Sequence, residues 1–291
     1  MQTISQDHAR HPVAGVRTAA DTVISIVRST DGTTIAYERR GSGAPLIVVD
    51  GALCSRAFGP SPKLAPLLAQ HFTVFTYDRR GRGQSGDARQ YAPSREVEDI
   101  GAIIQEAGGS ASLLGLSSGG ALALEAAANG LPIDTVIAYE PPYVDANGQG
   151  GGARHEAQLK QLLCDGRRGD AVKYFMKDMV GAPAALVVMM RMMPWIWRKL
   201  EAVAHTLPYD AAVMTEFKIP QTRFRSIDRP TLVMNGSKTD ARLRDAARTL
   251  AHVVPDARYC ELPGQTHNVK PAILVPAVVE FMASTAVAAR S

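Results

Sequence analysis

The chain has few cysteines, and their positions form no pair. Its 291 residues contain Cys54, Cys164 and Cys260, which lie far apart and make no CxxC motif. An odd, scattered set argues against a disulfide framework and lacks the ligand spacing of a zinc site. The cysteine content therefore favours a reducing compartment, and we expect no metal.

Long hydrophobic runs are also lacking. Residues 1–21 contain no continuous apolar segment of the kind that forms the centre of a secretory signal. The most apolar stretch, 182–197, is interrupted by Arg191 and Pro194 and is too short to span a bilayer. We therefore expect a cytoplasmic protein with no membrane partner.

Charges of one sign do not form runs. The formal net charge is +4 and the pI is about 9.0, yet no five like charges follow one another. The densest basic cluster is Arg79-Arg80-Gly81-Arg82. Such scatter is weak evidence for anionic surfaces and argues against a nucleic-acid partner. Because 46% of the residues are hydrophobic and only 21% are charged, extensive disorder is excluded.

What the sequence does contain is an alternation of two apolar patterns. Helical patterns are interspersed with short runs that are apolar on both faces, as in strands buried between helix layers. This alternation predicts a doubly wound, mostly parallel eight-stranded sheet, with the first two strands as an antiparallel hairpin. The expected strands are 22–27, 34–37, 45–49, 73–77, 112–116, 135–139, 231–234 and 258–262, and the expected helices are 96–106, 119–129, 242–253 and 272–284.

The alternation stops after Tyr139 and resumes near Pro230, and only helical patterns lie between. This indicates a helical cap inserted after the sixth strand. We expect a core domain formed by 22–140 and 227–291, a cap formed by 141–226, and an N-terminal extension formed by 1–21.

A GxSxG motif carries the main chemical signal. Gly115-Leu116-Ser117-Ser118-Gly119 lies between a predicted buried strand and a predicted helix. A nucleophile on such a sharp turn needs small residues two positions to either side, because the backbone is crowded there. The motif predicts Ser117 as a nucleophile, with the Ser118 N–H free to stabilise an oxyanion. An ordinary glycine-rich turn is the alternative.

Two further segments fit the same chemistry. Of the seven histidines, His267 is the one that follows the last predicted strand on a loop, where a general base for Ser117 belongs. The segment Asp50-Gly51-Ala52-Leu53 follows the third predicted strand. In folds with such a nucleophile turn, the loop after this strand normally donates a second oxyanion N–H, and we assign that role to Ala52.

Together these motifs resemble the α/β-hydrolase superfamily. A DxRGxGxS-type loop spans 78–85, the GxSxG elbow spans 115–119, and a PGxxH ending spans 263–267, all in the family's order. The resemblance runs from about residue 23 to 281, apart from the insertion. It implies a serine hydrolase with a catalytic triad, an oxyanion hole and a cap, and it implies no cofactor.

Two positions depart from the family pattern. Asp50 stands where members commonly have histidine, and pairing with an arginine such as Arg79 or Arg80 is favoured over a catalytic role. The triad acid is also ambiguous. Glu140 ends the sixth predicted strand, whereas Asp240, in the family's more usual region, is equally well explained as a helix N-cap. We favour Glu140 narrowly and keep Asp240 as the alternative.

Other interpretations remain open at this level. Residues 81–86 spell GxGxxG, but a nucleotide-binding motif should open a helix directly, and here 87–93 intervene. A non-catalytic small-molecule receptor on the same fold is the main rival from another class. A serine in place of aspartate separates the chain from relatives that open epoxides or displace halide.

The insertion gives the best indication of the substrate. Methionine and tryptophan side chains cluster around Pro194, and flexible thioethers suit adaptable apolar pockets. We therefore expect a mainly hydrophobic small-molecule ester or lactone, with carbon–carbon bond hydrolysis as an alternative; a homodimer is left open. The expected pocket residues are Leu53, Met189, Met193 and Trp195.

Overall fold

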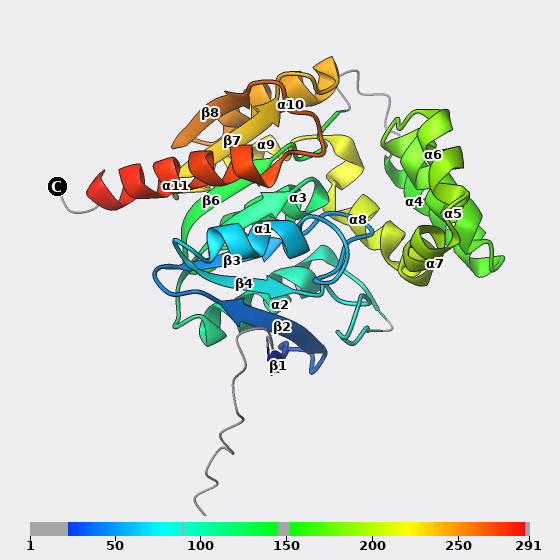
Figure 1. Ribbon diagram of the computed structural model, residues 1–291, viewed down its shortest axis with the longest axis horizontal. Helices are drawn as coiled ribbons and strands as arrows, with labels where there is room; N and C mark the ends of the chain where they lie inside the picture. Colours follow the sequence, from blue (N-terminus) through cyan, green and yellow to red (C-terminus); the bar gives the residue numbers. More distant parts are fainter. Residues whose placement is uncertain (1–22, 89, 145–151, 289–291) are drawn as a thin grey trace, which may run out of the picture.

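The computed structural model describes residues 23–88, 90–144 and 152–288. Eight strands form one sheet in the order β1-β2-β4-β3-β5-β6-β7-β8, and the strands from β4 onward are parallel (Figure 1). The predicted fold class is therefore confirmed. The strands are β1 (Ile24–Arg28), β2 (Thr34–Arg40), β3 (Pro45–Val49), β4 (Thr73–Tyr77), β5 (Ala111–Leu116), β6 (Ile133–Tyr139), β7 (Thr231–Gly236) and β8 (Ala257–Leu262).

Helices cover both faces of the sheet. On one face α1 (Ser61–Leu68) and α11 (Pro271–Ala288) bury a cluster that includes Leu68, Ile137 and Val278. On the other face α2 (Pro93–Glu106), α3 (Ser118–Ala128) and α10 (Ala241–Val253) bury a second, larger cluster. Because each parallel strand lies between these layers, its residues are apolar on both sides.

The strand order places the candidate site. Chain connections run from β3 outward to β4 and then back across β3 to β5, so neighbouring loops diverge at the carboxyl ends of β3 and β5. Such a switch point opens a crevice at that edge of a doubly wound sheet. The loop that begins at Asp50 and the turn that contains Ser117 both start there.

One core helix was not predicted from the sequence. Helix α1 contains Pro62 and Pro66, and a proline inside a helix removes a backbone hydrogen bond. The helix nevertheless forms, because Leu64 and Leu68 are almost completely buried against the sheet. Tertiary packing outweighs the unfavourable local propensity here.

Six α-helices among the described residues lie between β6 and β7, where the sequence predicted a helical cap. Figure 1 shows α4 to α7 as a separate layer, whereas α8 lies between that layer and the sheet domain. The domain boundaries stay a prediction, and the expected N-terminal extension lies outside the described residues. The helices are α4 (Gly152–Cys164), α5 (Arg168–Tyr174), α6 (Ala184–Arg191), α7 (Pro194–Ala202), α8 (Leu207–Val213) and α9 (Gln221–Phe224).

Among the described helices, α11 alone is long and apolar enough, by length and composition, to cross a membrane. It is a different segment from the apolar stretch 182–197 that the sequence drew attention to. In the fold α11 packs beside α1 through Leu274, Val275, Val278 and Phe281, which are all buried. These contacts give its apolar side chains a role in the core.

Candidate active site

The turn after β5 holds Ser117 in a strained conformation. Its φ of 54° and ψ of −125° lie where residues with a side chain rarely occur. The Ser117 N–H donates to the Tyr139 carbonyl at 2.9 Å, which ties the turn to the end of β6. Ser117 is partly accessible, whereas the residues on either side of it are buried.

The two glycines of the elbow are required by close backbone contacts. A Cβ on Gly115 would lie 2.4 Å from the Gly119 carbonyl oxygen, and one on Gly119 would lie 2.0 Å from the Val49 carbonyl oxygen. Neither position has room for any side chain. The crowding that the sequence motif predicted is therefore present, and it presses the elbow against the end of β3.

His267 is paired with Glu140. The His267 Nδ1 lies 2.7 Å from Glu140 Oε2, and the other carboxylate oxygen accepts from the Gly236 N–H at 2.8 Å and the Thr239 hydroxyl at 2.5 Å. Glu140 is completely buried and has a φ of 47°, while the His267 side chain is 37% exposed. Because a carboxylate only accepts hydrogen bonds, this contact suits the neutral tautomer that carries its proton on Nδ1 and its lone pair on Nε2.

The alternative acid, Asp240, has a structural role. Its carboxylate caps α10 by accepting from the Arg242 N–H at 2.9 Å, and it also pairs with the Arg242 guanidinium. The pKa of Asp240 is lowered by these hydrogen bonds. The structure thus brings Glu140, and not Asp240, into contact with His267.

The candidate nucleophile and the candidate base are connected through the ends of two adjacent strands. Ser117 follows β5, Glu140 follows the adjacent β6, and the Tyr139 hydroxyl donates to the carbonyl of Thr266 at 2.6 Å. Within the described part of the chain, the Ser117 hydroxyl makes no hydrogen bond to the His267 ring. Such contacts often tighten only when a substrate is bound.

Two backbone N–H groups are free beside Ser117. Ser118 is the first residue of α3, and neither its N–H nor that of Ala52 donates a hydrogen bond within the described residues. A Cβ on Gly51 would lie 3.1 Å from Ser117 Cβ and 3.7 Å from Ser117 Oγ, so the loop after β3 touches the serine. This arrangement suits the binding of an oxyanion.

The expected pairing of Asp50 with an arginine is wrong. Arg79 binds Glu96 and Asp210, and it reaches only the backbone oxygen of Asp50. Arg80 binds Asp99 and Asp31.

The Asp50 carboxylate is buried, and its Oδ1 has no hydrogen-bond partner among the described residues. Burial raises the pKa of Asp50 to about 7, against the opposing effects of Ser61, Arg82 and Arg79.

The basic cluster that the sequence singled out is not a surface patch. Arg79, Arg80 and Arg82 are each 1% exposed and lie in ion pairs beneath the candidate site. One partner, Asp210, comes from α8 of the cap, and sequence reasoning missed it. No spacing could have found it, because more than 120 residues separate it from either arginine.

The expected pocket residues lie in different environments. Leu53 is buried in an apolar cluster that the loop after β3 shares with the cap, and Ala52 packs against that cluster. Met193 is half-buried, whereas Met189 and Trp195 are 52% and 64% exposed. The cap side chains in the cluster are others, including Val187, Met190, Ile196 and Trp197. A substrate-lining role for the four expected residues stays a prediction.

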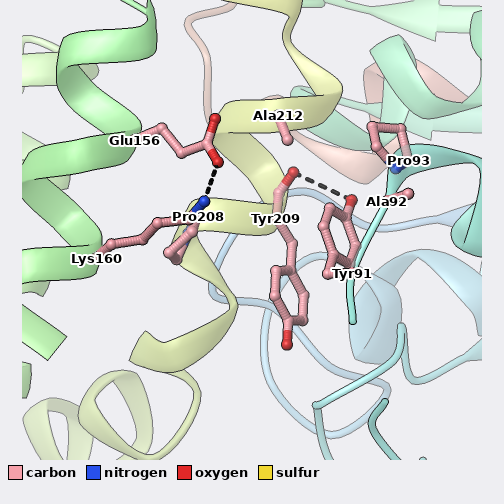
Figure 2. Close-up of a pocket in the computed structure, with 8 residues that line it drawn as sticks. All are labelled: Tyr91, Ala92, Pro93, Glu156, Lys160, Pro208, Tyr209 and Ala212. Atoms are coloured by element: carbon pink, nitrogen blue, oxygen red, sulfur yellow. Dashed lines mark hydrogen bonds and ion pairs between the residues drawn. The ribbon is translucent and has the colours of Figure 1, made fainter. Parts of the chain in front are cut away.

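A cavity of about 450 Å³ lies where the cap meets the sheet domain, and neither Ser117 nor His267 lines it. In Figure 2 the Glu156–Lys160 ion pair of α4 forms one wall, and the Tyr91 and Tyr209 rings lie face to face on the other. These two rings stack at 3.9 Å, and the Tyr91 hydroxyl donates to the Tyr209 carbonyl at 3.2 Å. The contacts fix the start of α8 to the sheet domain.

No group of three or more His, Cys, Asp or Glu side chains in the described ranges is arranged to hold a metal ion. The GxGxxG segment, 81–86, forms a loop, and α2 begins only at Pro93. That loop encloses the Asp78 carboxylate, which accepts from the Gln84 N–H and from Arg56. It therefore lacks the helix N-terminus that a nucleotide-binding motif needs.

The comparisons with known proteins show the family to which the chain belongs. A model of the alpha/beta hydrolase family matches residues 31–279. The solved structure of an alpha/beta hydrolase from Sphaerobacter thermophilus DSM 20745 is 52% identical, with a TM-score of 0.83 over 89% of this chain and 100% of that one. No protein among curated sequences matches the chain.

More distant structures share the fold. An esterase, RhEst1, from Rhodococcus sp. ECU1013 is 20% identical with a TM-score of 0.66, over 90% of this chain and 99% of that one. An enol-lactonase from Burkholderia xenovorans LB400 has the same identity and TM-score, over 89% of this chain and 100% of that one.

Proposed function

The chain belongs to the alpha/beta hydrolase family, and from this premise we propose that it is a serine hydrolase that cleaves a carboxylic ester or lactone of a mainly hydrophobic small molecule. The observation that carries the proposal is the 2.7 Å contact between His267 Nδ1 and the buried Glu140 carboxylate, next to the strained Ser117 turn. Nucleophilic catalysis accounts for both features, because it uses a nucleophile on a strained turn and a buried carboxylate that orients the imidazole.

The reaction begins with proton transfer from Ser117 to His267. Nε2 of the imidazole takes the hydroxyl proton while Ser117 Oγ forms a bond to the carbonyl carbon. The Glu140 carboxylate stabilises the imidazolium that results. The negative charge moves to the carbonyl oxygen, where the N–H groups of Ala52 and Ser118 donate hydrogen bonds to it.

The intermediate then collapses to an acyl-enzyme. The bond from carbon to the leaving oxygen breaks, and His267 returns its proton to that oxygen. Water, deprotonated by the same imidazole, attacks the acyl carbon, and Ser117 leaves with the proton. In a lactone the leaving oxygen stays attached to the acyl group, so a single hydroxy acid is released.

The substrate class follows from the surroundings of the site. Ala52 and Leu53 contact the apolar cluster of the cap, so a group bound beside the oxyanion donors meets methionine, tryptophan and aliphatic side chains. Burial of such a group contributes roughly 25 cal/mol for each Å² of apolar surface. The two distant neighbours named as an esterase and an enol-lactonase make these the first substrate classes to test.

Labelling with a fluorophosphonate tests the proposal. We expect one equivalent of label on the peptide that contains Ser117 and no label in Ser117→Ala. Turnover of a p-nitrophenyl ester by that variant should fall about 10³-fold or more. Undiminished hydrolysis by Ser117→Ala would exclude Ser117 as the nucleophile. Tight binding of the esters and lactones without label or turnover would instead identify a receptor.

A further inference from the structure

Two buried arginines bind backbone carbonyls of the loop after β3. Arg82 Nη1 donates to the Gly51 carbonyl at 2.7 Å, and Arg79 Nη1 donates to the Asp50 carbonyl at 3.3 Å. Both guanidinium groups come from the loop that follows β4. Two successive carbonyls of the loop beside Ser117 are thus bound by cations.

The contact at Gly51 fixes the direction of the Ala52 N–H. The Gly51 carbonyl and the Ala52 N–H belong to one planar trans peptide unit, so they point in opposite directions. When Arg82 holds the carbonyl, the N–H is aimed to the other side of the loop. A hydrogen bond from a cation also polarises the peptide and makes its N–H a stronger donor.

A single cap residue holds both arginines. Asp210 in α8 accepts from Arg82 Nη2 at 2.6 Å through Oδ2 and from Arg79 Nη1 at 2.7 Å through Oδ1. The same Oδ1 accepts from the Ser118 hydroxyl at 2.7 Å. The cap carboxylate therefore contacts Ser118 directly and reaches the Gly51–Ala52 peptide through Arg82. Ser118 and the Gly51–Ala52 peptide carry the two free N–H groups beside Ser117.

The charges of this cluster balance, which allows it to be buried. Arg79 and Arg82 are neutralised by Asp210 and by Glu96, which binds Arg79 at 2.6 Å. Burial opposes ionisation of Asp210, but the charges of Arg82 and Arg79 and the Ser118 hydroxyl hold its pKa below the ordinary value. Asp210 thus stays ionised. Because it lies on α8, its charge can pair with Arg79 and Arg82 only while α8 packs on the sheet domain.

We propose that Arg82 and Asp210 are positioning residues for acyl transfer, which align the oxyanion donors and make their alignment depend on a seated cap. The inference rests on the proposed function of Ser117, because it assigns a role to groups around that serine. It adds a coupling between cap and sheet domain: displacement of α8 removes the carboxylate that holds both arginines.

The variant Asp210→Asn keeps the shape of the side chain and removes its charge. We expect kcat to fall about 10- to 100-fold with little change in KM, somewhat less than the loss of a whole oxyanion donor. The Ki of an apolar trifluoromethyl ketone, which forms a tetrahedral adduct with a serine, should rise by the same factor by which kcat/KM falls. In Arg82→Lys, too, the Ki of the ketone should rise by the same factor by which kcat/KM falls.

Asp99→Asn is the matched control. Asp99 is equally buried and forms an equally close pair with Arg80, but among the described residues it makes no hydrogen bond to the loop after β3 or to Ser118. Its variant should lose comparable thermal stability and keep kcat and the ketone Ki. An equal loss of activity in Asp99→Asn, or an unchanged ketone Ki in Asp210→Asn, would overturn the inference.

Fluorophosphonate labelling separates this outcome from failure of the proposed function. If Asp210→Asn reacts slowly but still binds one equivalent on Ser117, and its ketone Ki has risen, both proposals stand. If labelling is complete but the ketone Ki is unchanged, only the positioning role fails. If the unsubstituted protein is not labelled on Ser117, the proposed function itself fails.

Discussion

At the scale of single residues, strain marks the candidate site. Five non-glycine residues in the described part of the chain have positive φ, and three of them, Leu53, Ser117 and Glu140, follow β3, β5 and β6 at one edge of the sheet. Each such residue costs of the order of 1–3 kcal/mol. Their concentration at the carboxyl ends of these strands indicates that the surrounding structure holds the three residues in place.

The two candidate acids make opposite predictions. Glu140→Gln removes the charge that stabilises the imidazolium, so kcat for an ester should fall about 10²- to 10⁴-fold. Asp240→Ala should leave kcat unchanged and lower the free energy of unfolding by about 0.5–2 kcal/mol, because α10 loses its cap. Steady-state kinetics and urea unfolding of both variants test this, and equal small losses of activity would show that neither is the triad acid.

Asp50 gives a prediction about pH and stability. Burial raises its pKa from the ordinary 3.8 to about 7 in the folded protein. Between these values the folded state binds more protons than the unfolded state, so this carboxyl lowers stability as the pH rises towards 7. Asp50→Asn should therefore gain stability relative to the unsubstituted protein over that range, by up to about 1.4 kcal/mol per pH unit. Urea unfolding at several pH values measures the difference, and parallel curves would contradict it.

At the scale of elements, the sequence predicted most of the sheet and its core helices. Strands β3 and β4 have the predicted limits, and α10 begins one residue earlier than predicted. These elements are visible because burial between two helix layers imposes a continuous apolar run on each strand. Helix α1 was not predicted, because its two prolines give the segment a low helix propensity and only packing stabilises it.

The elbow offers a prediction at this scale. Gly119→Ala would place a Cβ 2.0 Å from the Val49 carbonyl oxygen, so it should destabilise the fold by about 1–3 kcal/mol or more and abolish activity. Gly101→Ala on α2 is the control, because its Cβ would meet only Leu131, at 3.5 Å. That variant should gain up to about 1 kcal/mol from helix propensity. Thermal melting compares the two, and similar melting temperatures would contradict the crowding argument.

At the scale of the whole molecule, composition and position in the fold carry different information. The arginine cluster accounts for part of the basic charge, yet it lies in the interior and contributes little to the surface. Helix α11 has the composition of a membrane segment, yet one side of it packs on the sheet. In both cases the surroundings of a segment, and not its composition, decide what it does.

The role of α11 can be tested by stability. Leu274 is completely buried, so Leu274→Ala should lower the free energy of unfolding by about 2–5 kcal/mol. Val287 lies on the same helix and is 69% exposed, so Val287→Ala should change stability by less than about 0.5 kcal/mol. Urea unfolding measures both values. An unchanged stability in Leu274→Ala would mean that α11 is not part of the core.

The sequence by itself determined the fold class, the elbow around Ser117 and the loop that carries His267. These depend on local patterns, since apolar periodicity and glycine spacing act over a few residues. Tertiary structure alone decided that Glu140 contacts His267, that Asp50 lacks an arginine partner, and that Asp210 joins the cap to the loop beside Ser117. Each of these depends on which side chains meet after folding, and residues about 30 to 130 positions apart meet according to the path of the chain, which no local pattern encodes.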